Sequence, residues 1–493
     1  MKTFAFAIFA VLLILAQRSS AERRSSSESF EFFTRKIVCH FDCLSYNRGS
    51  FTPEDIDPFL CTHINYEYAR LNEDTYEIDY LDQSIDIDQN YYDRIISLRH
   101  KNQDLKILLS IGGWEDSASS KYSDLAGDKD RRSHFTETAI KFLKKHRFDG
   151  LNIAWLYPNC WHGKCGSNSD DKDNYVQLLK ELRKAFDKED LLLTASVSAV
   201  VEHIDAGYDV PEVTKLVDYV NVLTYDLHRG EESKTGHHSQ FYNSSSNLDA
   251  SPNFDLAANH WIDLGARRSK LVMGIPSYGR TWTLADKNSN GLDADARGPG
   301  LAGSLTQREG LLGYNEICPD DGWTEFSNGL IGIYATKDDQ WVSYDTTRTA
   351  ILKSRYVRYY GLGGVAYRFF STDDYEGNCF GHRYPILKSI HYGLGDYDER
   401  YQAINEDDVQ GMLSTIQLPG LSDDNDDLLD TEDDLDDLTG LDTALDGFDL
   451  NTDLDTGLEN LDADLDGTDF NADEDMGAAL EEGTANLNAG LAW

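Results

Sequence analysis

Short apolar runs alternate with amphipathic stretches between Arg35 and about Gly395. Eight of the runs are apolar nearly throughout, which is typical of parallel strands buried on both faces. The predicted strands are Lys36–Phe41, His63–Glu67, Ile107–Ile111, Gly150–Ala154, Leu193–Val197, Tyr219–Leu223, Leu271–Ile275 and Gly364–Arg368. Between them, Phe135–Lys145 and Tyr175–Phe186 have apolar residues at helical spacing. Eight strands with intervening helices predict an α/β fold, a (β/α)8 TIM barrel.

The gap between the last two predicted strands is unusually long, at nearly ninety residues. It contains strand-like segments of its own, Ile331–Thr336 and Trp341–Tyr344. We therefore expect a small α+β subdomain, at about residues 283–360, inserted in a barrel domain that spans residues 35–396.

Charge divides the chain into two parts. The 493 residues include 45 basic and 87 acidic ones, a formal charge of −42. From Tyr401 to Trp493 there are 28 acidic residues and no Lys or Arg, which leaves −14 for the first 400 residues. This predicts a mildly acidic folded body and a disordered, low-complexity acidic tail at residues 397–493. Because nucleic acids and anionic membranes are bound through clustered positive charge, neither is an expected partner.

The N-terminus has the pattern of a secretory signal peptide. Lys2 precedes an apolar run from Phe4 to Ala16, and Ser19 and Ala21 are small residues before a cleavage site. The run is shorter than the roughly 20 residues that span a bilayer. We predict a signal peptide at residues 1–21, a Ser/Arg-rich leader at 22–34, and a secreted protein.

Seven cysteines fit an oxidising compartment. Because seven is odd, at least one is free or pairs with another chain. Cys160 and Cys165 flank a short loop that a disulfide can close, whereas a zinc site is disfavoured because the cysteines are scattered. Asn243 begins an Asn-Ser-Ser sequon, a glycosylation site in a secreted chain.

The segment Phe148–Pro158 reads Phe-Asp-Gly-Leu-Asn-Ile-Ala-Trp-Leu-Tyr-Pro. It resembles the fourth strand of the family 18 glycoside hydrolases, the chitinases and chitinase-like proteins, where Asp-Gly-x-Asp-x-Asp-x-Glu precedes Tyr-Pro. Six further segments resemble the family's first, second, third, sixth, seventh and eighth strands and occur in the expected order: Lys36–Cys39, Cys61–His63, Ser110–Trp114, Asn221–Asp226, Gly274–Arg280 and Gly361–Gly364. The resemblance implies the barrel, the inserted subdomain, and disulfides Cys39–Cys61 and Cys318–Cys379.

The family's three spaced acids are absent. In the family they point to one side of the strand, and their repulsion raises the pKa of the outermost Glu, which protonates the glycosidic oxygen. The neighbouring Asp orients the N-acetyl group of the substrate, which acts as nucleophile. Here these positions are Asn152, Ala154 and Leu156, and of the family's acids Asp149 alone remains. We therefore predict no catalytic residue and no glycosidase activity, so a residual chitinase is the least favoured function.

Two other acids, Glu67 and Glu115, lie near strand ends. Either one would replace the lost Glu only if it were placed to well under an ångström, so we do not expect rescue.

The residues that match the family's saccharide cleft are only partly retained. The glycan-binding candidates are Gly112, Gly113, Trp114, Glu115, Tyr157, Leu223, Tyr225, Asp226, Tyr278, Arg280 and Arg368. Arg368 replaces the family's Trp, which removes a large stacking surface, and His40, Leu44 and Tyr68 replace other aromatic residues. Two interpretations stay open: the cleft binds chitin or a related N-acetylglucosamine glycan, or these side chains only fill the barrel mouth, with Asp226 and Arg280 as a bracing ion pair.

The acidic tail contains Asp462-Ala-Asp464-Leu-Asp466-Gly467, which matches the first half of an EF-hand loop. Its twelfth position is Asp473 and flanking helices are not evident, so many weak calcium sites are a better interpretation than one EF-hand. No other cofactor is expected.

Dense carboxylates on a chitinase-like protein resemble acidic matrix proteins. They indicate an extracellular matrix component that binds calcium or mineral, as in biomineralisation. Two alternatives stay open: the tail only keeps the chain soluble, or the protein is a soluble, growth-factor-like or signalling chitinase-like protein.

Overall fold

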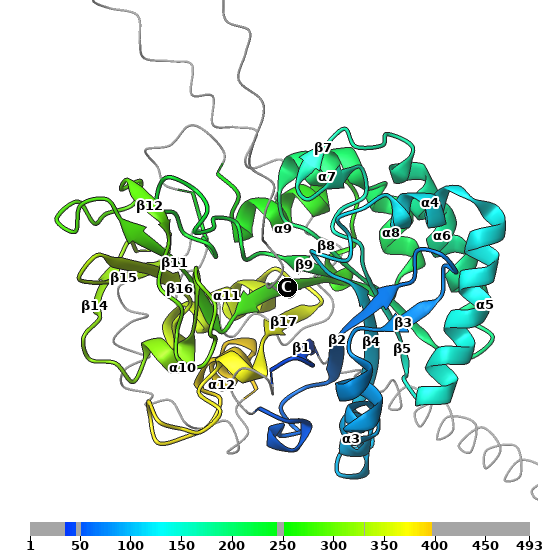
Figure 1. Cartoon of the computed structure of the whole chain (residues 1–493), viewed down its shortest axis with the longest axis horizontal. Helices are drawn as coiled ribbons and strands as arrows, with labels where there is room; N and C mark the ends of the chain where they lie inside the picture. The colour runs from blue at the N-terminus through cyan, green and yellow to red at the C-terminus, as the bar shows by residue number, and fades with distance from the viewer. Residues whose placement is uncertain (1–34, 46–50, 244–250, 330, 397–493) are drawn as a thin grey trace, which may run out of the picture. The chain divides into compact units, whose positions relative to one another are not determined.

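The computed structural model describes residues 35–45, 51–243, 251–329 and 331–396. Eight parallel strands form a closed ring, because β1 pairs with both β17 and β2 (Figure 1). They are β1 (Lys36–Asp42), β2 (His63–Leu71), β4 (Lys106–Gly112), β5 (Gly150–Ala154), β8 (Leu192–Ser198), β9 (Tyr219–Leu223), β10 (Leu271–Pro276) and β17 (Gly364–Arg368). Each contains one of the eight predicted strands, and the (β/α)8 barrel is confirmed.

Helices accompany the barrel strands. They are α3 (Tyr91–Ser97), α4 (Lys121–Gly127), α5 (Lys129–His146), α6 (Asp171–Phe186), α7 (Val201–Gly207), α8 (Val210–Leu216), α9 (Phe254–Asp263), α11 (Thr347–Tyr359) and α12 (Pro385–Leu394). Short helical turns are η1 (Pro53–Asp55), η2 (Ser84–Asp88), η3 (Leu98–His100), η4 (Arg268–Lys270) and η5 (Phe370–Thr372).

The predicted helices lie within α5 and α6 but are shorter. The α5 helix begins earlier because the Asp128 side chain accepts a hydrogen bond from the Arg131 amide at 2.9 Å. Such a cap sets the start of a helix independently of its apolar face.

A second sheet lies between β10 and β17 in the chain (Figure 1). It consists of β11 (Tyr278–Leu284), β12 (Ala296–Pro299), β13 (Leu311–Gly313), β14 (Thr324–Ser327), β15 (Ile333–Lys337) and β16 (Gln340–Tyr344), with the short helix α10 (Tyr314–Ile317). The insertion therefore begins near Tyr278 rather than residue 283. The α11 helix packs against β10 and β17 and is a barrel helix, so the predicted end at residue 360 was also wrong. Local apolar patterns do not tell which sheet a segment joins.

Two short pairings complete the secondary structure. β3 (Ile78–Tyr80) runs antiparallel to β2, and β6 (Cys160–Trp161) pairs with β7 (Lys164–Cys165) in a hairpin. Three disulfides join Cys39–Cys61, Cys160–Cys165 and Cys318–Cys379, as expected, and the seventh cysteine, Cys43, is buried and free.

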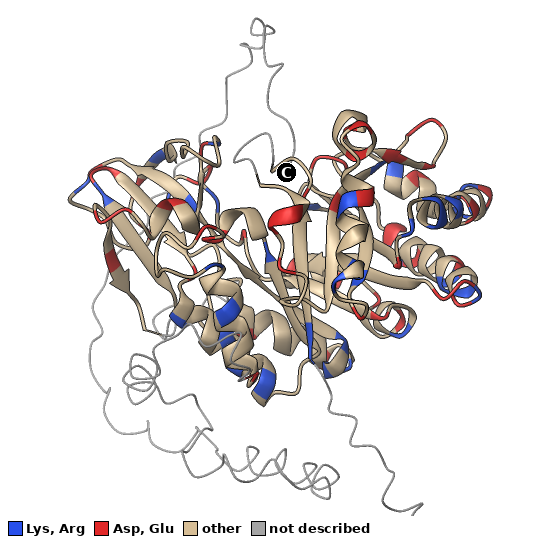
Figure 2. Ribbon diagram, turned by 90° about the horizontal axis from the view of Figure 1, so that it is seen from below, with Lys and Arg blue, Asp and Glu red and all other residues tan. Residues whose placement is uncertain are grey.

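Charged residues lie mainly on helices and loops, with both signs interspersed (Figure 2). Within the described part of the chain, no helix is long and apolar enough to cross a membrane. Asn243 is exposed, so its side chain is accessible to glycosylation, which stays a prediction. The predicted signal peptide, leader and tail, with Asp462, Asp464 and Asp466, lie outside the described residues.

Candidate functional site

A cavity opens where the barrel strands β5, β9 and β17 end, beside β11 of the second sheet. Eight of the predicted glycan-binding residues line it: Trp114, Tyr157, Leu223, Tyr225, Asp226, Tyr278, Arg280 and Arg368. Sequence reasoning therefore grouped these side chains correctly, although their affinity for a glycan stays a prediction.

The other three candidates have different positions. Glu115 is exposed and is not among the lining residues, and neither are Gly112 and Gly113. The Gly113 amide donates to the Ala154 carbonyl at 2.9 Å, and a Cβ on Gly112 would lie 2.3 Å from that oxygen. The two glycines thus allow close approach of the backbone after β4 to the end of β5.

The β5 wall is the name used here for Asn152, Ala154 and Leu156, the three positions where the family pattern has acids. Asn152 is fully buried inside the barrel. Its amide nitrogen donates to the hydroxyls of Ser110 at 3.1 Å and Ser196 at 3.0 Å. Its side-chain oxygen accepts hydrogen bonds from Thr194 and Asn221. These bonds satisfy a neutral amide, so the first position of the wall has a structural role.

The other two positions of the β5 wall are apolar. The side chain of Leu156 packs in a buried cluster with Leu223, Leu311 and Phe369 beside the cavity. Ala154 is fully buried. The family's remaining acid, Asp149, precedes β5 at its opposite end, where it accepts hydrogen bonds from Arg99 at 2.6 Å and the Ile107 amide at 2.7 Å. It therefore stabilises the barrel far from the cavity mouth.

The paired-charge wall is the name used here for two ion pairs, Glu67–Arg368 and Asp226–Arg280, of which Asp226, Arg280 and Arg368 line the cavity. Glu67 is 1% exposed and lies 3.3 Å from the Arg368 guanidinium and 2.5 Å from His40. Burial by itself would raise the pKa of Glu67, but Arg368 and His40 hold it below its ordinary value. Glu67 is thus an ionised partner of Arg368 and unsuited to donate a proton, which argues against rescue by this residue.

Arg368 takes the place of a stacking surface. Its guanidinium donates to the hydroxyls of Tyr68 at 3.0 Å and Tyr225 at 3.3 Å, and lies 4.3 Å from the ring centroid of Phe369. These contacts solvate a charge that is 8% exposed. The substitution of the family's Trp is therefore accommodated by a complete set of partners, of which Glu67 carries the opposite charge.

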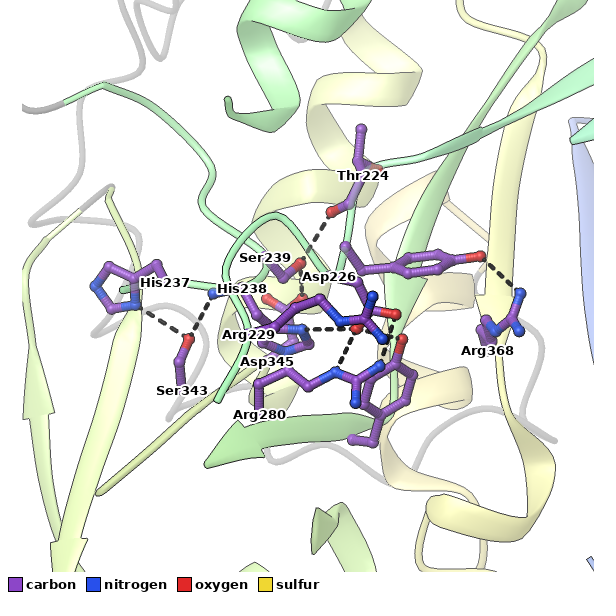
Figure 3. Close-up of polar contacts among 12 residues, drawn as sticks. Thr224, Asp226, Arg229, His237, His238, Ser239, Arg280, Ser343, Asp345 and Arg368 are labelled. Atoms are coloured by element: carbon purple, nitrogen blue, oxygen red, sulfur yellow. Dashed lines mark hydrogen bonds and ion pairs between the residues drawn. The ribbon is translucent and has the colours of Figure 1, made fainter. Parts of the chain in front are cut away.

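In the second ion pair, Asp226 accepts hydrogen bonds from the side chains around it (Figure 3). Arg280 donates from Nε and Nη2 at 2.6 and 2.8 Å, and the Tyr278 hydroxyl donates at 3.0 Å. Burial would raise the pKa of Asp226, but Arg280 and His238 hold it well below its ordinary value. Asp226 is the single carboxylate among the lining residues and is ionised. The Asp226–Arg280 pair connects the segment that follows β9 with β11, and it is compatible with both interpretations of these side chains.

Acids with a raised pKa do occur in the described structure, at other places. Burial raises the pKa of Asp86 to about 7 and that of Asp373 to about 6. Neither lines the cavity. Asp373 accepts hydrogen bonds from the Tyr367 hydroxyl and from the first amides of α12. The acids whose pKa suits proton donation are therefore part of the packing.

Trp114 retains an indole at the cavity, but its ring is in contact with two side chains. His162 stacks on it with a centroid separation of 5.0 Å and an interplanar angle of 3°. The Arg229 guanidinium lies 5.0 Å from the same centroid. Sequence analysis missed both contacts. His162 lies in the turn of the β6–β7 hairpin. The Cys160–Cys165 loop was the one sequence feature that could have drawn attention to this residue.

Among the described residues, one group of potential metal ligands lies close together: Cys318, Asp374 and Cys379. The two cysteines form a disulfide, so their thiolates are not available to a metal.

The chain matches the model of the glycosyl hydrolases family 18 over residues 36–373. The probable chitinase 10 of Drosophila melanogaster is 38% identical over 364 residues, which cover 72% of this chain but 16% of that protein. One similar solved structure is a mutant of the Group II chitinase catalytic domain 2 of Ostrinia furnacalis, in complex with penta-N-acetylchitooctaose. Its TM-score is 0.72 and its sequence identity 38%, and the match covers 74% of this chain and 97% of that chain.

Human YKL-39, described as a pseudo-chitinase with retained chitooligosaccharide binding properties, has a TM-score of 0.67 and 35% identity. The match covers 73% of this chain and 100% of that chain. Both hydrolases and a pseudo-chitinase are thus similar to this chain over its barrel.

Proposed function

The chain belongs to glycosyl hydrolase family 18, and from this we propose that it is a secreted chitinase-like protein that binds N-acetylglucosamine oligosaccharides without hydrolysing them. The observation that carries the absence of hydrolysis is the chemistry of the cavity. Leu156 stands where the family pattern has the proton donor, and the single lining carboxylate, Asp226, is ionised. A general acid contributes roughly 10²–10⁴-fold to such a reaction, and no lining side chain is suited to supply it.

Retained binding is supported by the aromatic side chains at the cavity. Trp114, Tyr157, Tyr225 and Tyr278 all line it, and aromatic rings supply large contact areas at low entropic cost. Human YKL-39 is described as a pseudo-chitinase that still binds chitooligosaccharides. The Ostrinia chitinase that was solved with an oligosaccharide is a mutant with a glutamate replaced by leucine, so loss of a carboxylate is compatible with saccharide binding in that protein.

The test combines a hydrolysis assay with retention on chitin beads. We expect no chromophore release from a chito-oligosaccharide substrate, and retention on the beads that falls roughly tenfold or more in Trp114→Ala. Trp323→Ala is the matched control, because Trp323 is a half-buried Trp that does not line the cavity. Chromophore release would contradict the loss of catalysis, and equal retention of the Trp114→Ala protein and the parent would contradict the binding site.

We further propose that the protein belongs to an extracellular matrix and that its acidic tail binds calcium or mineral at many weak sites. After residue 400 the chain has 28 acidic residues and no Lys or Arg. This composition supports calcium binding by the tail, because hard cations prefer oxygen ligands. Recovery from the insoluble, demineralised fraction of the source tissue would support a matrix role. Recovery only from body fluid would favour a soluble signalling protein instead.

A further inference from the structure

Aliphatic side chains from several elements line a large part of the cavity. They are Leu156, Ala199, Val200, Leu223, Leu227 and Leu311. The name apolar cluster is used here for Leu156 after β5, Leu223 in β9, Leu311 in β13, and Phe369 after β17, which pack together in the core. Trp114 packs against this cluster. The aromatic surface on which the proposed saccharide stacks therefore adjoins a surface made of hydrocarbon.

The charged side chains of the cavity are already engaged within the protein. Five of the lining side chains carry a charge, and each has an interaction of its own: Asp226, Arg229, Arg280, Arg308 and Arg368. Two of these interactions are the ion pairs of the paired-charge wall, and Arg229 lies 4.0 Å from Glu231. These charges therefore give no reason to expect a charged ligand.

Polar lining side chains are hydrogen-bonded within the protein as well. The Tyr278 hydroxyl donates to Asp226 at 3.0 Å, and the Tyr225 hydroxyl accepts from Arg368 at 3.3 Å. Both ring nitrogens of His203 have hydrogen-bond partners. The capacity of these groups to bind the hydroxyls of a sugar is reduced, and a polar group that is buried without a partner is costly.

Leu156 has no means of binding a polar group of a ligand. Its side chain consists of carbon, and its backbone amide already donates to the Ser117 hydroxyl at 3.0 Å. A ligand atom that faces Leu156 loses water and gains no hydrogen bond in return, which disfavours a hydroxyl or an amide there. An apolar group at the same place is favoured, because its burial removes hydrocarbon from water.

We propose that the cavity selects an amphiphilic glycoside, a short N-acetylglucosamine saccharide with an apolar aglycone, in which the saccharide contacts Trp114 and the aglycone contacts the apolar cluster. Leu156 is the specificity-determining residue. This inference rests on the proposed function, in which the cavity holds a saccharide. A mainly apolar lining with a few polar groups that fix orientation is typical of sites for small organic ligands.

Calorimetric titration of the full-length protein tests this preference with three probes. They are chitobiose, octyl chitobioside, and octyl glucoside, the last two used below their micelle concentrations. We expect octyl chitobioside to bind about tenfold more tightly than either other probe, which corresponds to burial of about two methylene groups. Its binding should also have the more negative heat-capacity change, the mark of apolar burial. The advantage over chitobiose should persist as sodium chloride rises from about 50 to 500 mM, because it is not electrostatic.

Three variants locate the effect, and the readout is the ratio of the affinities for octyl chitobioside and chitobiose. Leu156→Gln places an amide in the apolar cluster and should reduce this ratio from about tenfold to about twofold. Leu156→Met keeps an apolar side chain of similar volume and should retain the ratio within about twofold. Leu301→Gln is the matched control, because Leu301 is 68% exposed and does not line the cavity. It should leave both affinities unchanged.

The outcomes separate this inference from the proposed function. Equal binding of chitobiose and octyl chitobioside by the parent protein, a comparison that requires no variant, overturns the amphiphilic preference and leaves saccharide binding intact. Octyl glucoside that binds as tightly as octyl chitobioside shows that hydrocarbon is bound without recognition of the saccharide, and also overturns the preference. An unchanged ratio in folded Leu156→Gln overturns the role of Leu156. Absence of binding by all three probes overturns both proposals.

Discussion

Leu156 of the β5 wall and Asp226, Arg280 and Arg368 of the paired-charge wall line the same cavity, but the two groups of residues differ in charge. On the β5 wall, Asn152, Ala154 and Leu156 carry no charge and are satisfied by hydrogen bonds or apolar packing. On the paired-charge wall, Glu67–Arg368 and Asp226–Arg280 keep four charges, of which three are nearly buried, whereas the side chain of Asp226 is 30% exposed. The charged residues of the second wall are thus paired with one another, whereas the residues at the positions of the family's acids are neutral.

Charge in a cavity is therefore poor evidence of acid–base chemistry. A general acid must be protonated before the reaction, which requires a raised pKa. The carboxylates of Glu67 and Asp226 have lowered pKa values because each has an Arg partner. Removal of one partner of a buried pair is costly, since the other charge stays buried. Such pairs therefore stabilise the fold whether or not the cavity is catalytic.

The largest expected effect comes from breaking the Glu67–Arg368 pair. Glu67→Ala leaves the Arg368 guanidinium buried without its carboxylate, and we expect the free energy of unfolding to fall by about 3–5 kcal/mol. Chemical denaturation measures it. The control is Glu54→Ala, because Glu54 pairs with Arg94 at the surface with 59% of its side chain exposed, and surface pairs contribute about 1 kcal/mol or less. Similar losses in both variants would show that the buried Glu67–Arg368 pair stabilises the protein no more than a surface pair does.

Restoring acids to the β5 wall tests it from the other side. The combined substitutions Asn152→Asp, Ala154→Asp and Leu156→Glu should raise chromophore release from a chito-oligosaccharide roughly 10²-fold over the parent. Leu156→Glu by itself should give no turnover, because no carboxylate then orients the N-acetyl group of the substrate. Leu223→Glu is the control, since Leu223 belongs to the same apolar cluster on another strand. Turnover in this control would show that any carboxylate in the cavity suffices.

The pH dependence of stability should separate the paired charges from buried neutral histidines. Burial lowers the pKa of His237 to about 3, below its ordinary value near 6.5. The unfolded chain therefore binds the extra proton first, and the stability that His237 contributes is lost as pH falls from about 6.5 toward 3. This loss of unfolding free energy amounts to about 2 kcal/mol between pH 7 and pH 5.

Glu67 and Asp226 have the opposite dependence. Because their folded pKa values are lowered, their contribution is present above the ordinary carboxylate pKa and is lost only below roughly pH 4. His237→Gln should therefore reduce the slope of the stability profile between pH 7 and pH 5 without abolishing it, because burial also lowers the pKa of His63 to about 3. Glu67→Gln should lower stability across this range without changing the slope. Thermal unfolding across this range measures both. An unchanged slope in His237→Gln would contradict the expectation.

The smallest effect concerns the Trp114 ring. His162→Ala removes the imidazole that stacks on Trp114, so we expect chito-oligosaccharide affinity to rise roughly threefold, in line with the energy of one aromatic stack. Titration with chitohexaose measures it, with His134→Ala as control, because His134 pairs with Glu77 on the surface. A loss of affinity would show instead that His162 is part of the saccharide-binding surface.

Much of the fold could be predicted from local pattern. Every barrel strand is a short apolar run, and a period of two along β5 was enough to identify Asn152, Ala154 and Leu156 as one face. The insertion was found from spacing, but its bounds were not, because β11 follows β10 directly and α11 returns to the barrel. The signal peptide, the leader and the acidic tail stay predictions, since these segments lie outside the described residues.

The sequence by itself determined the barrel, the disulfide partners implied by its family, and the absence of the family's acids from one strand, because these depend on residues near one another in the chain or on a known motif. Tertiary structure decided the state of the charges. Glu67 and Arg368 are far apart in sequence and form a buried pair, and Arg229 meets Trp114 only across the cavity. Ionisation depends on burial and on the nearest opposite charge, and both are properties of the folded chain.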